Sequence, residues 1–119
     1  MKKVEIIGAA IVDVLVTPAE ETVFRTGSYP AQQIVMTCGG DALNEATVLR
    51  HLGVPVHLET LIGADAAGET VRRRMEQVGL EMSGLHVRPE LATSVNVVLV
   101  KPDGERCFLT NPHSSQRQL

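Results

Sequence analysis

Hydrophobic and polar positions in the first half of the chain fall into β-type and helical stretches. Residues 4–16, VEIIGAAIVDVLV, are almost continuously apolar and rich in β-branched side chains. This pattern is typical of a strand buried on both faces, and we place its central part at Lys3–Gly8. A second run of this kind, VPVHLETLIG at residues 54–63, predicts another strand.

Two amphipathic helices are predicted around the second run. The first begins at Asp41, which is placed to cap it, and ends at Gly53. The second is capped by Asp65 and closed by Gly79. Small and aliphatic residues recur at intervals of three and four on the inner faces: Ala42, Ala46 and Leu49 in the first helix, and Ala67, Val71, Met75 and Val78 in the second. Strands alternating with helices indicate βαβ units and a parallel sheet, hence an α/β fold.

Other parts of the chain have a β-type pattern without helices. Residues 21–36 mix β-forming residues with a break at Gly27–Pro30, which suggests two short strands at a sheet margin. Two β-rich runs within residues 94–110 flank Pro102-Asp103-Gly104 and predict a hairpin. A weak strand is expected at residues 84–88, and residues 112–119 read as a loop or the start of a helix. Because a parallel sheet needs helices on both faces, the fold looks incomplete.

Composition limits the classes of function. The chain has 119 residues, 44% of them hydrophobic, and a net charge of −3, with Arg72-Arg73-Arg74 as its longest run of like charge. We therefore expect a single domain that binds neither nucleic acid nor a membrane. Because Cys38 and Cys107 are too distant for a metal or redox motif, reduced thiols in a cytoplasmic protein are the simplest account. His51, His57, His86 and His113 lack ligand-like spacing, so no metal site is expected.

The stretch CGGDALNEATVLRHLG, residues 38–53, is the first candidate binding segment. Gly39-Gly40 before a helix lets a polar ligand approach the main chain, and Asn44 offers an amide with donors and acceptors. Asp13 follows the first apolar strand, at the sheet edge where α/β proteins bind ligands, and a carboxylate accepts two hydroxyl hydrogen bonds. The alternatives are that the glycines only form a turn, Asn44 is an ordinary helix residue and Asp13 is an exposed loop acid.

Residues 39–63, GGDALNEATVLRHLGVPVHLETLIG, resemble the first signature of the ribokinase-like, or PfkB, family of carbohydrate kinases. The fixed positions are Gly39-Gly40, Asn44, Ala46, Gly53 and Gly63. Gly63, Asp65 and Gly68 also match the family's next segment, and the resemblance extends over residues 1–119.

The resemblance implies a Rossmann-like ribokinase fold with a small β-sheet lid, formed here by strands around residues 22–36 and 94–110. It implies ATP-dependent, Mg²⁺-dependent phosphorylation of a sugar or sugar-like hydroxyl. In the family, residues matching Asp13, Gly39, Gly40 and Asn44 hold the sugar, and lid positions such as Asn96 and Asn111 are candidates for substrate contact. Lid strands that pair between subunits would give a homodimer.

The resemblance also defines what is missing. Family members run to about twice this length or more, and their Gly-x-Gly-Asp segment with the catalytic base has no counterpart here. The Asn-x-x-Glu segment associated with Mg²⁺ is also missing. We therefore expect the N-terminal part of a sugar kinase, carrying no catalytic residue, binding ATP and Mg²⁺ poorly and inactive alone. Position 41 is aspartate where ribokinase has lysine, and this departure argues against ribose itself as the substrate.

Two other enzyme classes fit the sequence less well. A dinucleotide-binding fold also opens with a strand, a glycine and a helix, but residues 8–13, GAAIVD, lack the further glycines of that fingerprint. No Gly-Lys-Ser/Thr P-loop occurs in the chain. The more serious alternative is non-catalytic: a sugar-binding module, or one that dimerises through its lid.

Overall fold

The protein is described here by a computed structural model covering residues 2–112 and 114–118. Its strands form two sheets, a body sheet in the order β1-β4-β5 and an outer sheet in the order β3-β2-β6-β7. In chain order the elements are β1 (Val4–Ile7), β2 (Ile11–Thr17), α1 (Val23–Thr26), β3 (Gln33–Gly39), α2 (Asp41–His51), β4 (Val56–Ile62), α3 (Ala66–Val78), the 3₁₀ turn η1 (Met82–Gly84), β5 (Leu85–Val87), β6 (Val95–Val100), β7 (Arg106–Thr110) and the 3₁₀ turn η2 (Ser115–Gln118).

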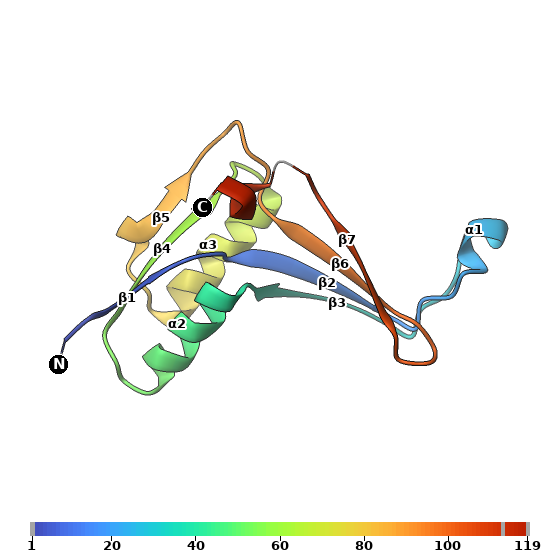
Figure 1. Ribbon diagram of the computed structural model, residues 1–119, viewed down its shortest axis with the longest axis horizontal. Coiled ribbons are helices and arrows are strands. Elements are labelled where there is room, and N and C mark those ends of the chain that lie inside the picture. The colour runs from blue at the N-terminus through green and yellow to red at the C-terminus, as the bar shows by residue number, and fades with distance from the viewer. Residues whose placement is uncertain (1, 113, 119) are drawn as a thin grey trace.

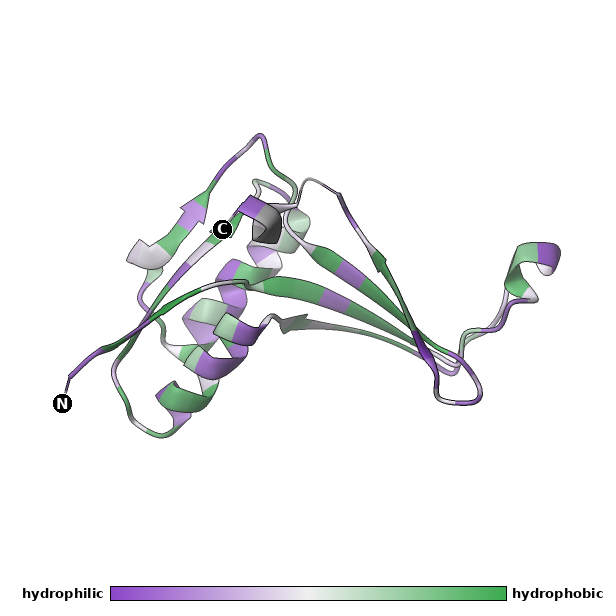
Figure 2. Cartoon of the chain, viewed as in Figure 1, coloured by the Kyte–Doolittle hydropathy of each residue, from purple (hydrophilic) through white to green (hydrophobic). Residues whose placement is uncertain are grey.

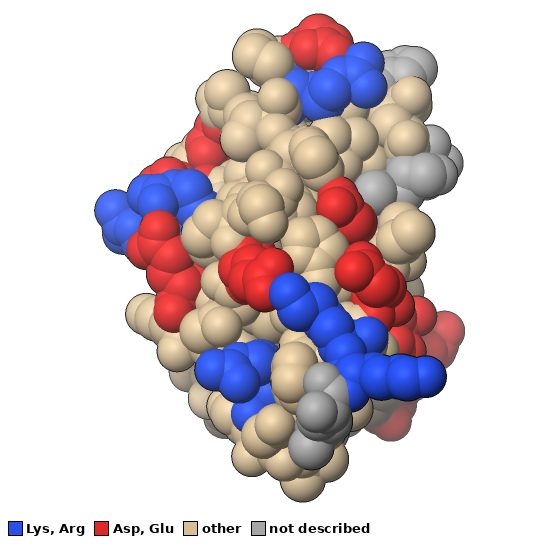
Figure 3. Space-filling model, turned by 90° about the vertical axis from the view of Figure 1, so that its left-hand side faces the viewer, with Lys and Arg blue, Asp and Glu red and all other residues tan. Residues whose placement is uncertain are grey.

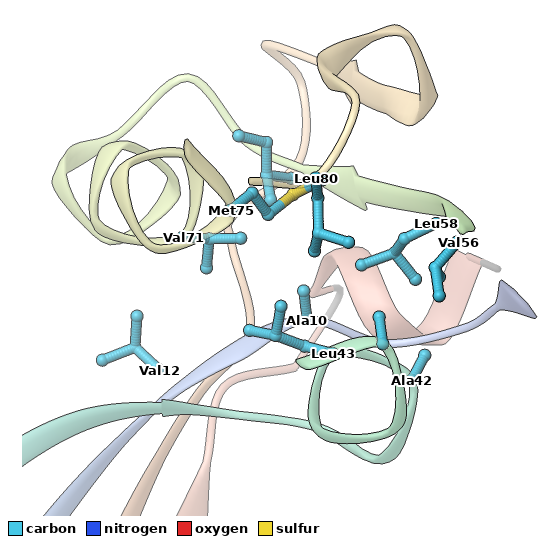
Figure 4. Packing of buried hydrophobic residues seen from close by; sticks show 11 residues of the cluster. Ala10, Val12, Ala42, Leu43, Val56, Leu58, Val71, Met75 and Leu80 are labelled. Carbon is cyan, nitrogen blue, oxygen red and sulfur yellow. The ribbon is translucent and has the colours of Figure 1, made fainter. Parts of the chain in front are cut away.

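The body sheet is parallel, as the sequence predicts, and α2 and α3 lie beside it (Figure 1). Strand β4 turns alternate residues, including Leu58, toward the helices, where Leu43 of α2 and Met75 of α3 meet them (Figure 4). All three side chains are at most 1% exposed. Burying a side chain of this size stabilises a fold by roughly 1.5–3 kcal/mol. This aliphatic core therefore fixes the positions of the first turn of α2 and the carboxyl end of β1.

The outer sheet extends from one end of the body (Figure 1). Strands β2 and β6 pair in parallel at its centre, while β3 and β7 pair antiparallel at its edges. The radius of gyration is 16.1 Å, whereas a compact domain of this length has about 13.5 Å. Apolar and polar residues both occur along the strands of this sheet (Figure 2), and large apolar side chains such as Ile34 and Phe108 are 68% and 59% exposed.

The apolar run at residues 4–16 forms two strands, so the prediction of one strand buried on both faces is wrong. The chain turns between Ile7 and Ile11, and β1 joins the body sheet while β2 joins the outer sheet. Within the described residues β1 pairs only with β4, and Ile7 is 76% exposed. Asp13 consequently lies beyond the end of β1, as expected, but inside a second strand.

The two strands predicted within residues 21–36 are also different in the structure. Residues Val23–Thr26 form the short helix α1, and a single strand, β3, begins at Gln33 and extends to Gly39. Strand β3 pairs with β2, whose residues Val12–Val16 pair on both sides. β-Forming residues alone did not distinguish the segment around α1 from a strand.

Most turn and capping predictions are confirmed. The Asp65 carboxylate caps α3 by accepting a 2.8 Å hydrogen bond from Gly68 N, and Gly79 ends that helix in a left-handed conformation. The hairpin around residues 102–104 joins β6 and β7, and the weak strand at residues 84–88 is β5. Asp41, however, is the first residue of α2 and not its cap, because Gly40 occupies the N-cap position.

Charges of both signs are interspersed on the end of the body opposite the outer sheet (Figure 3). Lys3 contacts Glu81 at 2.5 Å, and Glu81 contacts His57 at 3.1 Å. Glu59 bridges His57 at 2.9 Å and His86 at 2.5 Å. These five residues form a chain of alternating basic and acidic side chains, which we call the charge ladder.

Candidate functional site

A pocket of about 590 Å³ lies where the outer sheet meets the body. It brings together the end of β1, the turn that follows, the first turn of α2, and the starts of β2 and β6. Its lining residues are Ile6, Ile7, Gly8, Ala9, Ile11, Asp13, Gly40, Asp41, Ala42, Asn44, Glu45 and Asn96. Four of the six residues singled out from the sequence, namely Asp13, Gly40, Asn44 and Asn96, are therefore in one pocket.

Asp13 is at the centre of a row of polar residues that crosses the outer sheet. Its Cα partner is Asn96 on β6 and Thr37 on β3, and Asn96 in turn faces Thr110 on β7. Residues directly opposite each other on paired strands point to the same face of a sheet. The row Thr37-Asp13-Asn96-Thr110 therefore presents two hydroxyls, a carboxylate and an amide on the face that borders the pocket.

Burial and hydrogen bonding act in opposite directions on the carboxyl group of Asp13. Partial burial raises its pKa, and a hydrogen bond from the Asn96 side chain counteracts part of that rise. The Oδ1 atom of Asn96 is buried without a hydrogen-bond partner among the described residues. A buried acceptor of this kind carries a desolvation cost until a donor reaches it.

The paired glycines make this arrangement sterically feasible, each in its own way. A Cβ atom at Gly39 would lie 2.2 Å from Asp13 Oδ2, so the space left by the missing side chain holds the carboxylate. Gly40 has a φ of +94°, and a Cβ atom there would lie 2.4 Å from the carbonyl oxygen of Ala9. Gly39 thus accommodates Asp13, while Gly40 turns the chain into α2 and lines the pocket.

The first turn of α2 forms the opposite wall. Asn44 is exposed there and its backbone N–H bonds to the Gly40 carbonyl oxygen at 3.0 Å. No side-chain hydrogen bond caps the helix among the described residues; Leu43 N instead donates to the Ala9 carbonyl oxygen at 3.3 Å. Asp41 and Glu45 add carboxylates to this wall.

Asn111 has a different place in the structure. Its Oδ1 atom accepts a 3.0 Å hydrogen bond from Val95 N, and its Nδ2 atom donates at 2.9 Å to the carbonyl oxygen of Thr93. Both ends of the amide are thus bound to backbone at the start of β6. The pocket lining does not include Asn111.

Sequence reasoning missed four polar residues near the site. Thr37 and Thr110 share the row of Asp13, and Asp41 and Glu45 line the pocket. Each threonine follows a short apolar run near the end of its strand, and this local pattern does not distinguish it from an ordinary β-forming residue. The pattern also could not give the register, which depends on pairing between distant segments.

The charge of the pocket disfavours an anionic guest. Among its described lining residues there are three carboxylates and no Lys, Arg or His side chain. No group of three or more His, Cys, Asp or Glu side chains in the described part of the chain is arranged to hold a metal ion. Within the same residues, no helix is long and apolar enough to cross a membrane.

Comparison with known proteins identifies the family. The model of the pfkB family carbohydrate kinases matches residues 1–119. The chain belongs to this family. An uncharacterized sugar kinase of Escherichia coli, YegV, is 32% identical over 109 residues, which are 92% of this chain and 33% of YegV. An ATP-dependent ribose-1-phosphate kinase from Halopiger xanaduensis is 36% identical over 73 residues, 61% of this chain and 25% of that protein.

Solved structures of pfkB-type kinases share the fold. A fructokinase from Xylella fastidiosa has a TM-score of 0.80 at 22% identity, covering 98% of this chain and 36% of that one. A putative ribokinase II from Escherichia coli has a TM-score of 0.79 at 23% identity, covering 100% of this chain and 37% of that one. The body and outer sheet are thus part of the ribokinase fold. The chain spans about a third of the length of YegV and of these solved chains.

Proposed function

We propose that this chain forms the acceptor side of an ATP-dependent carbohydrate kinase, where it binds a sugar or a similar hydroxylated molecule. The observation that carries the proposal is the pocket shared by Asp13, Gly40, Asn44 and Asn96 at the junction of the two sheets. It lies outside the carboxyl end of the parallel strand β1, which is where open α/β sheets bind ligands.

Each polar group of the pocket suits a hydroxyl. The Asp13 carboxylate accepts hydrogen bonds from hydroxyl groups, and the amide of Asn44 both donates and accepts. The Oδ1 atom of Asn96, buried and without a partner in the described part of the chain, gains a donor when a hydroxyl approaches. In a partly desolvated pocket such bonds are stronger than in water. We therefore assign the sugar hydroxyls to Asp13, Asn44 and Asn96, with Gly39 and Gly40 shaping the site.

An uncharged acceptor fits better than a phosphorylated one. Three carboxylates without a neighbouring cation repel a phosphate group, which proteins bind with Arg, Lys or backbone N–H groups. The ribose-1-phosphate kinase from Halopiger xanaduensis acts on a phosphorylated sugar by its name. We propose that this chain selects a neutral sugar.

The described residues do not fit ATP and Mg²⁺. Phosphoryl transfer depends on positioning and on neutralising the charge around the phosphates, mostly with cations. The pocket carries the opposite charge, and no described cluster of side chains suits a metal ion. A fructokinase of Xylella fastidiosa has been solved with bound ATP, and the chain matches 32% of it. We therefore propose that the nucleotide site and the catalytic base are supplied by residues other than these 119, and that these 119 residues alone transfer no phosphate.

The outer sheet is proposed to act as a lid. It carries Asp13 and Asn96 on the face bordering the pocket and extends away from the body (Figure 1). A lid that closes over sugar excludes water, which prevents hydrolysis of the phosphoryl donor.

A second candidate role is dimerisation through the outer sheet. Apolar side chains are exposed on both of its edge strands: Ile34 and Met36 on β3, and Phe108 and Leu109 on β7 are 59–68% exposed. Edge strands with exposed apolar residues favour pairing with another chain. Analytical ultracentrifugation of the chain over a range of concentrations tests this role, and a strictly monomeric protein contradicts it.

Sugar binding is tested by comparing Asp13→Ala with Asp103→Ala. Asp103 lies in the β6–β7 turn, where it accepts a hydrogen bond from Glu105 N, and it is not part of the pocket lining. Ligand-observed NMR with pentoses, hexoses and nucleosides should detect binding to the parent and to Asp103→Ala, and a loss of at least about tenfold in Asp13→Ala, since a hydrogen bond to a charged group contributes about 1.5–3 kcal/mol. Equal binding by both variants would remove the role assigned to Asp13.

A further inference from the structure

The base of the outer sheet is tied to the body by a continuous hydrogen-bond network. It joins the start of α3, the segment before β6 and the residue that follows β7. These three segments are distant in sequence, and their central members are Asp65, Thr93 and Asn111. We call this set the lid-base network.

Asp65 and Thr93 form its first part. Thr93 is 1% exposed, and its Oγ1 atom donates to Asp65 Oδ1 at 2.6 Å while accepting from Gly63 N at 2.8 Å. Thr93 N donates to Asp65 Oδ2 at 2.9 Å. Burial pushes the pKa of Asp65 upward, but the hydrogen bonds from Thr93 and Gly68 outweigh it and hold the pKa below its ordinary value. The helix cap of α3 is therefore also the anchor of the chain entering β6.

Asn111 forms the second part. It bonds the carbonyl oxygen of Thr93 and the N–H of Val95, the first residue of β6. The next residue, Asn96, faces Asp13 across the parallel pair of β6 and β2. Two bonds on either side of Ser94 thus fix the direction in which β6 leaves the body, and with it the side on which Asn96 points.

We propose that Asp65, Thr93 and Asn111 are positioning residues that set the lid strand β6 so that the Asn96 amide meets the Asp13 carboxylate. The inference rests on the proposed sugar site, because it assigns these three residues an effect on that site without contact to the sugar. The sequence suggested that Asn111 contacts the substrate. In this proposal Asn111 acts on the site indirectly, by holding the start of β6.

A network that only stabilised the fold would have a different signature. Loss of a buried hydrogen-bond partner lowers stability wherever it occurs. Only a positioning role makes that loss change the surroundings of Asp13, because Asp13 is on another strand and bonds to none of the three residues. The titration of the Asp13 carboxyl group is therefore the informative readout.

Thr93→Val and Thr60→Val form a matched pair. Both threonines are 1% exposed, but the Thr60 hydroxyl has no hydrogen-bond partner among the described residues, whereas the Thr93 hydroxyl contacts Asp65 and Gly63. Valine has nearly the same shape as threonine, so each variant removes one hydroxyl. Thr60→Val is expected to leave the Asp13 titration unchanged. The stability of this variant should equal that of the parent or be slightly higher.

The experiment follows the Asp13 carboxyl carbon by ¹³C NMR from pH 3 to pH 8 in the 119-residue chain, with Asn96→Ala as the reference for a lost Asn96 contact. We expect Asn96→Ala to raise the Asp13 pKa, and Thr93→Val and Asn111→Ala to shift it in the same direction. A Thr93→Val protein that is less stable but keeps the parent's Asp13 titration overturns the proposal. If Thr93→Val does not fold, the same comparison is made with Asn111→Ala: lower stability with the parent's Asp13 titration overturns the proposal.

Sugar binding separates this inference from the proposed function. In the parent, the side-chain amide signals of Asn96 should shift when sugar is added. The sugar affinity measured from these shifts should be about fivefold to tenfold lower in Thr93→Val and Asn111→Ala. If the parent binds no sugar but the Asp13 pKa still shifts in these variants, the positioning role stands and the sugar site fails. If Thr93→Val and Asn111→Ala bind sugar as the parent does and keep its Asp13 titration, while Asn96→Ala binds sugar less tightly, the positioning role fails and the sugar site stands.

Discussion

Asp13 and Asn96 are Cα partners across the parallel strands β2 and β6, and the amide of Asn96 moderates the effect of burial on the Asp13 carboxyl group. The two residues are distant in sequence, and each is on a strand that enters the outer sheet from the body. Their meeting place borders the pocket at the start of α2. A partly buried carboxylate with an amide beside it is well suited to bind hydroxyl groups, but it is a cost to the fold while the pocket is empty.

Asp13→Asn should therefore stabilise the chain at neutral pH while weakening sugar binding. The folded-state pKa of Asp13 is raised above its ordinary value of 3.8, so the folded protein binds the proton more tightly than the unfolded chain does. The stability that this proton contributes declines as the pH rises from the Asp13 pKa of the unfolded chain through the higher pKa of the folded protein. Thermal unfolding should give a higher Tm for Asp13→Asn than for the parent at pH 7, with a smaller difference at pH 3. A lower Tm at pH 7 would contradict this reasoning.

Gly39→Ala should be destabilising only because Asp13 occupies the adjacent space. A Cβ atom at this position lies 2.2 Å from Asp13 Oδ2, and forced overpacking costs about 1–3 kcal/mol. In an Asp13→Ala background most of that cost should disappear. A double-mutant cycle by urea denaturation measures the coupling, which we expect to be about 1 kcal/mol or more; additive effects would show that the clash is relieved in another way.

His57 in the charge ladder should make stability dependent on pH near neutrality. Hydrogen bonds to Glu59 and, next, to Glu81 raise the His57 pKa above 6.5. Stability from protonated His57 is fully present below the unfolded pKa of about 6.5 and is lost as the pH rises through the folded value. Urea denaturation between pH 5 and pH 9 should show this decline in the parent and a weaker one in His57→Gln. His51→Gln, on the exposed surface of α2, serves as the control and should behave as the parent does.

The 119-residue chain should show no kinase activity. Its pocket has no cation to neutralise a triphosphate, and the described residues include no metal cluster. A coupled assay for ADP release with pentoses, hexoses and nucleosides should remain at background. ATP-dependent phosphate transfer by this chain would show that the acceptor side alone suffices.

Ile34→Lys should weaken self-association of the outer sheet. Ile34 is 68% exposed on the edge strand β3, where a charge opposes strand pairing and apolar burial. Sedimentation velocity should show a shift toward monomer relative to the parent. Val48→Lys is the control, because Val48 is 57% exposed but lies on α2 in the body.

Local pattern predicted much of the body. Ala42, Ala46, Val71 and Met75 were assigned to the inner faces of two helices and are buried in the core. Asp65 and Gly79 were recognised as the ends of α3 because capping depends on neighbouring backbone groups. Gly40 and Asn44, which the motif singled out, lie in the lining of one pocket.

The sequence by itself determined the two long helices, β4 and the β6–β7 hairpin, since periodicity, capping and turn chemistry are properties of adjacent residues. Only the tertiary structure decided which sheet each apolar segment joins, so that residues 4–16 became two strands in different sheets. It also decided that Asn111 bonds to backbone and that Thr37 and Thr110 share a row with Asp13. The physical reason is that strand alternation specifies two faces but not a partner or a register, which are set when distant segments bury their apolar surface together.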